Sequence, residues 1–208
     1  MKKSIADHAA RFDEYAAAYD DEQNSEEYRA CASLVIDHAA VGPGDVVLDL
    51  GCGTGAIGLA LAGRAQRVIG RDISEGMMER AREKAADRGL GNVEFGEGSF
   101  REPAVDEPVD VVVSNFAMHH LSDDEKRVAT DVIAGLGPRR FVLGDVMFFG
   151  DPDPAEPFYS PEVDDPATVG VLADALTAAG FSLTAVEMVH DQVGVLVAEG
   201  PRSSSGPS

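Results

Sequence analysis

The chain has 208 residues, 44% of them hydrophobic, which suffices for one globular domain with a full core but not for two large ones. Acids outnumber bases by 37 to 17, a formal net charge of -20, and no apolar run approaches the roughly 18 residues of a membrane span. The two cysteines, Cys31 and Cys52, are too few for a disulfide framework or a cysteine-ligated zinc site. We expect a soluble, cytoplasmic protein with no membrane partner.

Acidic residues are spread along the whole chain and are not gathered in one tail. Such a surface resembles that of proteins from salt-loving microbes, in which ionic screening weakens the repulsion between like charges. Binding to a nucleic-acid backbone needs a basic stripe, and the only adjacent arginine pair is Arg139-Arg140. The composition therefore predicts an acidic, halophile-like protein and disfavours nucleic acid as a substrate.

Short apolar runs alternate with helical patterns, which predicts an α/β fold with a doubly wound, mostly parallel sheet. The expected helices cover 4–20, 25–41, the glycine loop to Gly63, a stretch capped by Ser74, and a stretch from the Ser122–Glu125 capping box to Gly135. The expected strands are Val46–Leu50, Arg67–Asp72, Val93–Phe95, 109–115 and Phe141–Asp145.

The amino-acid composition changes after the fifth expected strand. Residues 148–166 are rich in proline and acids without a periodic pattern, which indicates a long irregular loop of the kind that is often functional. Asp165-Pro166 then fits the N-cap and first position of a helix that ends near Gly180. Strands at 181–189 and 192–198 predict an antiparallel hairpin at the sheet edge, and the tail 201–208 is expected to be disordered.

The stretch 46-VVLDLGCGTGAIG-58 holds two overlapping glycine fingerprints. Gly53, Gly55 and Gly58 spell the G-x-G-x-x-G of a dinucleotide site, whereas Gly51, Gly53 and Gly55 spell the loop of S-adenosylmethionine (SAM) enzymes. In both, glycines let the backbone pass close to a ligand at a helix N-terminus. An acid about 20 residues further on grips a ribose in either case, so Asp72 does not discriminate.

Asp49 separates the two interpretations. It lies inside an apolar strand, two residues before the first glycine, where its carboxylate would repel a pyrophosphate. SAM carries an ammonium and a sulfonium, and a cationic ligand is a physical reason for a buried carboxylate. The alternative is an aspartate that only accepts hydrogen bonds from amides of its own turn. Asp49 thus favours SAM over a dinucleotide.

Three segments together resemble class I SAM-dependent methyltransferases, and in particular small relatives of the ubiquinone/menaquinone-biosynthesis methyltransferases. They are the glycine loop, the leader 12-FDEYAAAYD-20 and the strand-four motif 114-SNFAMHHLSDDEK-126. The likeness covers about residues 10–198. It implies a Rossmann-like sheet of seven strands whose final hairpin supplies strands six and seven. The implied organisation is N-terminal helices at 1–41 forming part of a cofactor lid, a core at 42–200 and a tail at 201–208.

The resemblance implies S-adenosylmethionine as cofactor and a set of residues that bind it. These candidates are Tyr19, Asp49, Gly51, Cys52, Gly53, Thr54, Gly55, Asp72, Ile73, Met77, Ser99, Phe100, Asn115 and Phe116. One departure is Ser99, which stands where the family usually has an acid for the adenine amino group, so adenine recognition is weaker here and Phe100 is expected to pack against the ring. Cys52 is interpreted as a small spacer and not as a nucleophile.

A sulfonium makes its methyl group electrophilic, so alignment of the reacting atoms supplies much of the catalysis. A base is needed only when the nucleophile arrives protonated, and the candidates are His119, His120 and Asp145. His119 is the candidate catalytic residue, with structural bracing of the loop as the alternative. The adjacent histidines are expected to point apart, so no metal site is predicted. Tyr159 fits either a lid or a surface anchor.

The sequence predicts a methyltransferase that moves a methyl group from SAM to an unidentified small-molecule acceptor by in-line displacement. Two alternatives stay open: a noncatalytic SAM-binding protein and an NAD(P)-dependent Rossmann oxidoreductase. The expected partner is the small-molecule methyl acceptor, and a homodimer is a further option that the sequence does not decide.

Overall fold

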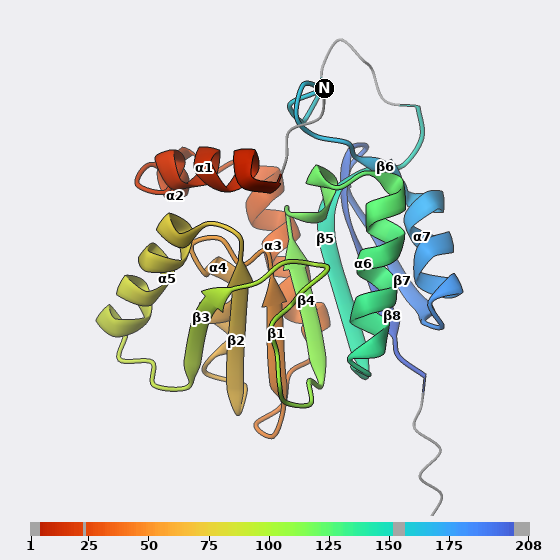
Figure 1. The fold of residues 1–208 in the computed structure, drawn as a ribbon. Helices are drawn as coiled ribbons and strands as arrows, with labels where there is room; N and C mark the ends of the chain where they lie inside the picture. The colour runs from red at the N-terminus through yellow and green to blue at the C-terminus, as the bar shows by residue number, and fades with distance from the viewer. Residues whose placement is uncertain (1–4, 23, 152–156, 202–208) are drawn as a thin grey trace, which may run out of the picture.

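The computed structural model describes residues 5–22, 24–151 and 157–201 (Figure 1). The predicted disordered tail, apart from Pro201, lies outside the described residues. Seven strands form one sheet in the order β3 (Val93–Glu97), β2 (Arg67–Asp72), β1 (Val46–Leu50), β4 (Val111–Asn115), β5 (Arg140–Phe148), β8 (Val193–Glu199) and β7 (Ser182–His190). β8 runs antiparallel to both its neighbours, and the other pairs on this path are parallel. The predicted doubly wound sheet with a C-terminal hairpin is confirmed.

Two predictions around the long loop are wrong. A further two-residue strand, β6 (Ala167–Thr168), pairs with the end of β5, so the described residues form eight strands where seven were expected. Asp165-Pro166 does not start the next helix, because these residues lead into β6 and the Asp165 amide donates to the His119 carbonyl at 2.7 Å. The hydroxyl of Thr168 caps α7 (Val169–Ala178) instead, accepting from the Val171 amide at 3.2 Å.

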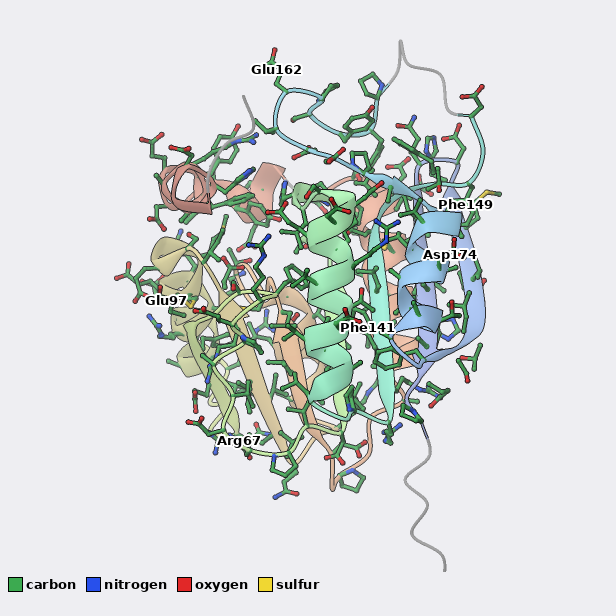
Figure 2. The ribbon with its side chains drawn as sticks, turned by 45° about the vertical axis from the view of Figure 1, so that its right-hand side comes forward. Arg67, Glu97, Phe141, Phe149, Glu162 and Asp174 are labelled. Atoms are coloured by element: carbon green, nitrogen blue, oxygen red, sulfur yellow. The ribbon has the colours of Figure 1, made fainter. Side chains whose placement is uncertain are left out.

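Helices cover both faces of the sheet. One face carries α3 (Glu26–Ala39), α4 (Ala56–Leu61) and α5 (Glu75–Asp87), and the other carries α6 (Asp123–Gly135) and α7, which lie side by side in Figure 1. Side chains of a strand alternate between the two faces, so Val47 packs toward α3 and α4 while Leu48 joins the core under α6 and α7. Phe141 of β5 lies in that second core beside α6 (Figure 2). None of the described helices is long and apolar enough to cross a membrane.

The N-terminal segment lies over the carboxyl ends of the parallel strands (Figure 1). The predicted single helix is two helices, α1 (Ile5–Tyr15) and α2 (Tyr19–Glu22), separated by a turn. Asp13 of α1 accepts from the Ser74 hydroxyl (2.6 Å) and the Gly76 amide (2.9 Å) at the start of α5. Asp20 of α2 accepts from the Thr54 hydroxyl at 2.6 Å. Because of the turn, Asp13 contacts the start of α5 while Asp20 contacts the glycine loop.

The described part of the loop after β5 lies above the same end of the sheet. In Figure 2, Glu162 marks the tip of this loop, whereas Arg67, the first residue of β2, lies at the opposite end of the molecule. A short 3-10 turn, η1 (Met118–His120), follows β4 at the loop side of the sheet. The helices α1 and α2, the glycine loop, η1 and this loop therefore converge at the carboxyl ends of the strands, where open α/β sheets bind ligands.

Candidate functional site

The glycine loop after β1 needs glycine for two different reasons. Gly51 has φ +67°, and a Cβ there would lie 2.3 Å from the Cβ of Ala117, so a side chain would clash with the segment after β4. Gly53 also has positive φ, +51°, but a Cβ there would meet nothing within 4 Å. Its amide donates to Oδ2 of Asp72 at 2.8 Å, and the Ser74 amide donates to Oδ1 at 2.9 Å. The loop thus stays close to Asp72 and leaves open space beside Gly53.

That space belongs to a first cavity of about 230 Å³ between the glycine loop and the N-terminal helices. The predicted cofactor residues that line it are Tyr19, Gly51, Gly53, Asp72, Ile73, Met77, Ser99, Phe100 and Phe116. The hydroxyl of Ser99 accepts from the amides of Arg101 (3.3 Å) and Glu102 (3.1 Å), so it is already engaged in its own turn. The wall is otherwise largely apolar, with the Asp72 carboxylate as its acidic group beside the loop.

A second, small cavity of about 20 Å³ shares Tyr19, Gly51 and Gly53 with the first. Asp49 lines it, is 1% exposed and accepts from the Gly58 amide at 2.9 Å. Burial raises the pKa of Asp49 to about 7, and this one hydrogen bond offsets only part of that effect. The interpretation that Asp49 serves only the amides of its own turn leaves most of this burial cost unexplained. A cation in the second cavity would favour the ionised carboxylate.

Asn115 and Thr54 line the same second cavity, as does Tyr28 of α3, which was not among the predicted cofactor residues. Oδ1 of Asn115 accepts from the thiol of Cys31 at 3.4 Å. Its buried Nδ2 has no hydrogen-bond partner within 3.5 Å in the described part of the chain, although the Asn115 side chain lies close enough to the Tyr28 hydroxyl to act on the pKa of Tyr28. Such a donor calls for an acceptor on a ligand, because an unpaired buried donor is costly.

Of the two remaining predicted loop residues, Cys52 lines the second cavity and Gly55 does not. Gly55 lines none of the three cavities described here: with φ +83° it starts α4, and a Cβ there would come within about 3 Å of Phe95, Ala81 and Leu59. Cys52 is 7% exposed, and burial raises the pKa of its thiol well above the usual range. A neutral, buried thiol agrees with the interpretation of Cys52 as a spacer.

A third cavity of about 270 Å³ shares four lining residues with the first. These shared residues are Phe12, Tyr19, Phe116 and His120. The remaining wall consists of Arg11, His119, Val146, Phe158, Tyr159, Ser160 and Asp164. Tyr159 packs against Phe148, with ring centroids 5.7 Å apart, so its position fits both the lid and the anchor interpretations. Since the first and third cavities share a wall, ligands in them would be neighbours.

His119 is 6% exposed and rests on a buried aspartate of β5. Its Nδ1 lies 2.5 Å from Oδ1 of Asp145, and its amide donates to Oδ2 at 3.0 Å. A carboxylate only accepts, so Nδ1 carries a proton and Nε2 is the site that can bind another. Burial lowers the pKa of His119, but the charge of Asp145 more than offsets this and the pKa lies above its usual 6.5. Among the residues that the structure describes, no side chain forms a hydrogen bond or an ion pair with Nε2 of His119.

His120 has its own carboxylate, with 2.7 Å between its Nδ1 and Oδ1 of Asp164. The expectation that the two histidines point apart is wrong: their ring centroids lie 4.0 Å apart, although His119 pairs with Asp145 of β5 and His120 with Asp164 of the loop after β5. One ligand atom each from His119, His120 and Asp164 lies within 4.8 Å of the others. Burial, with the nearby His119 charge, lowers the pKa of His120. The two histidines therefore differ in which carboxylate holds them and in how readily each takes a proton.

Comparison with known proteins gives this geometry a context. Residues 47–138 match the family model of a methyltransferase domain. An uncharacterised methyltransferase of Geobacillus sp. (strain WCH70) is 36% identical over 146 residues, which cover 67% of this chain and 65% of the relative. A 23S rRNA (uracil(1939)-C(5))-methyltransferase of Alkalilimnicola ehrlichii is 39% identical over 122 residues, 57% of this chain and 27% of that protein. The chain thus spans about two thirds of the first relative and about a quarter of the second.

Solved structures share the fold. A Haloferax volcanii methyltransferase, determined in complex with the Trm112 methyltransferase activator, has a TM-score of 0.75 at 20% identity and covers 92% of this chain and 98% of its own. Magnesium protoporphyrin IX methyltransferase of Synechocystis PCC 6803, determined with bound SAM, has a TM-score of 0.66 at 22% identity, covering 84% and 78%.

Proposed function

The chain belongs to the class I SAM-dependent methyltransferases, with SAM as its cofactor, and we propose that it methylates a small molecule held in the third cavity. The observation that carries this proposal is the shared wall of the first and third cavities, next to which Nε2 of His119 is free to take a proton. A methyl donor in the first two cavities would then face an acceptor in the third.

The residues present fit SAM. Asp72 beside the glycine loop suits the two hydroxyls of a ribose, and the apolar wall with Met77 and Phe100 suits adenine. Asp49 in the second cavity suits a cation, and the unpaired Nδ2 of Asn115 suits a carboxylate. We propose that helices α1 and α2, within the segment 1–41, close over this site through Asp13 and Asp20. When bound, SAM supplies a methyl group carried on a positively charged sulfur.

His119 gives the site a base for a protonated nucleophile. An acceptor oxygen or nitrogen would pass its proton to Nε2 of His119 as it took the methyl group that SAM would supply, and the sulfur would keep the electron pair of the carbon–sulfur bond. Asp145 holds the imidazole in the tautomer that this transfer needs and stabilises the imidazolium that results. Positioning by the cavity walls contributes the remaining acceleration.

An RNA acceptor is the second candidate, because one relative acts on 23S rRNA. Charge disfavours it: the chain carries a net charge of -20, and RNA binding gains most of its affinity from Lys and Arg contacts with phosphates. A cavity of about 270 Å³ is also suited to a compact ligand.

The test combines binding with turnover. Calorimetric titration in high-salt buffer with SAM, its demethylated product S-adenosylhomocysteine (SAH) and NAD is expected to show binding of the first two only. Methyl-labelled SAM is then offered with a small-molecule extract, with total RNA, and with each of these plus a Trm112-type activator. Label in small molecules supports the proposal, whereas label in RNA alone replaces it with the second candidate. SAM binding with no transfer in any mixture indicates a noncatalytic SAM-binding protein.

Asp72→Ala is expected to weaken SAM binding by about 1–3 kcal/mol, because ribose hydroxyls and two loop amides lose their acceptor. Calorimetric titration measures the affinity, and a thermal melt shows whether the variant is folded. Asp174→Ala is the control, since it removes an exposed carboxylate from α7, away from the cavities (Figure 2). Unchanged SAM affinity in folded Asp72→Ala would remove Asp72 from the ribose site.

A further inference from the structure

Arg11 of α1 lines the third cavity, is half-buried, and stands apart from the other sheltered basic side chains. Among described residues, each other buried or half-buried lysine or arginine has a carboxylate within 4.0 Å: Arg67, Arg71, Lys84, Lys126 and Arg140. No such partner is found for Arg11 in that part of the chain. In a protein with 37 acids and 17 bases, a sheltered guanidinium without a carboxylate leaves its charge for a ligand.

Asp164, the carboxylate in the same wall, does not pair with Arg11. Oδ1 of Asp164 lies 2.7 Å from Nδ1 of His120, and Oδ2 accepts from the Ser160 amide at 2.7 Å. Asp164 is therefore held by its own neighbours. A guanidinium presents its donors in a planar fork that matches a carboxylate with two parallel hydrogen bonds. Arg11 thus points to an anionic, carboxylate-like group on whatever enters the third cavity.

Much of the remaining wall of the third cavity is aromatic. Phe12, Phe116, Phe158 and Tyr159 line the third cavity, and the rings of Phe116 and Phe158 lie 6.3 Å apart. Aromatic walls favour a ring in offset or edge-to-face contact. A cavity of about 150 Å³ holds benzene, so the volume of about 270 Å³ here suits one ring with a few substituents. The cavity therefore combines a place for a ring, a cation and a free imidazole nitrogen.

We propose that the methyl acceptor is a single-ring phenolic carboxylate, with its ring among Phe116, Phe158 and Tyr159, its carboxylate on Arg11 and its hydroxyl on His119. This assignment rests on the proposed function and names the acceptor class for it. The phenolic oxygen gives its proton to Nε2 of His119 as it gains the methyl carbon, and the products are a methoxy acid and the neutral thioether.

The experiment compares binding of 4-hydroxybenzoate with binding of its uncharged methyl ester, by calorimetric titration in the presence of SAH. Wild-type protein is expected to bind the acid about ten- to a hundredfold more tightly than the ester, as one hydrogen-bonded charge pair provides. Arg11→Gln is expected to abolish this preference, and Arg11→Lys to restore part of it. Arg64→Gln is the matched control: Arg64 is exposed and precedes β2, whose first residue lies at the opposite end of the sheet (Figure 2).

Equal affinity for acid and ester, no binding of either, or a preference that survives in Arg11→Gln would each overturn this inference. Melting temperatures of the variants show that they are folded. The proposed function is tested separately, by SAM binding and by transfer of the labelled methyl group with the wild-type protein. Transfer to a neutral acceptor without a preference for the acid leaves the methyltransferase proposal standing and removes the phenolic carboxylate alone.

Discussion

Replacing His119 with glutamine is expected to lower kcat for a hydroxyl or protonated amine acceptor by about 10²- to 10⁴-fold, the usual contribution of a positioned base. SAM affinity is expected to stay within about twofold, since His119 lines the third cavity and not the first or second. Single-turnover transfer from labelled SAM measures the chemical step, and calorimetric titration measures the affinity.

His120→Gln is the matched control, because it removes the neighbouring ring, which has its own carboxylate and a lowered pKa. It is expected to reduce kcat by less than about tenfold. Equal losses of kcat in the two variants would contradict a base role for His119 and leave both histidines as braces of the loop.

The same base predicts a pH profile. Only neutral His119 accepts a proton, so the kcat of the wild-type enzyme is expected to rise with pH through the pKa of His119. Burial lowers this pKa, but Asp145 more than offsets burial, so the rise lies above pH 6.5. Asp145→Asn removes the opposing charge, and the rise is expected to move to lower pH while the plateau falls because the tautomer is no longer held. If the pH dependence of kcat is the same in Asp145→Asn as in the wild type, Asp145 does not set the pKa of His119 and the proposed pair is contradicted.

Local sequence signals predicted most of the fold. Val46–Leu50 and Arg67–Asp72 are strands over the predicted residues, since each contains a short cluster of apolar residues and leads into a loop. The Ser122–Glu125 capping box also begins α6 as predicted, because both of its hydrogen bonds are local. The start of α7 was mispredicted because Asp165-Pro166 has the local pattern of a helix start, whereas pairing of β6 with β5 is a long-range contact that such a pattern does not contain.

The candidate site also contains one part that local sequence signals predict and one part that depends on long-range contacts. Asp49, the glycines and Asp72 lie in one βαβ segment, so their spacing alone brings them together. The third cavity brings together Arg11 from α1 and Phe158 from the loop after β5, which are far apart in the chain. Nothing in the residues around either one marks a shared cavity. Residues of the proposed acceptor site therefore emerge only when the tertiary contacts are known.

Asp49→Asn is expected to change stability and SAM affinity in opposite directions. The pKa of Asp49 is raised from 3.8 to about 7 in the fold, so its carboxyl group lowers stability progressively as pH rises from about 4 and reaches its full cost above about 7. The uncharged amide avoids this cost. At pH 8 the ligand-free variant is expected to be more stable than the wild type by up to about 4 kcal/mol, and at pH 4 by little. Calorimetric melts at both pH values measure the difference.

SAM affinity is expected to fall in the same variant at pH 8, by about ten- to a hundredfold, because the ligand's positive charge loses its buried counter-charge. In wild-type protein, binding must first ionise Asp49 below pH 7, so affinity is expected to drop about tenfold between pH 8 and pH 6. In Asp49→Asn this part of the pH dependence should vanish, and Asp174→Asn should behave like the wild type. A variant that gained stability and kept full SAM affinity would mean that Asp49 serves only the Gly58 amide. Loss of affinity with gain of stability would instead identify Asp49 as a carboxylate kept buried for its cationic ligand.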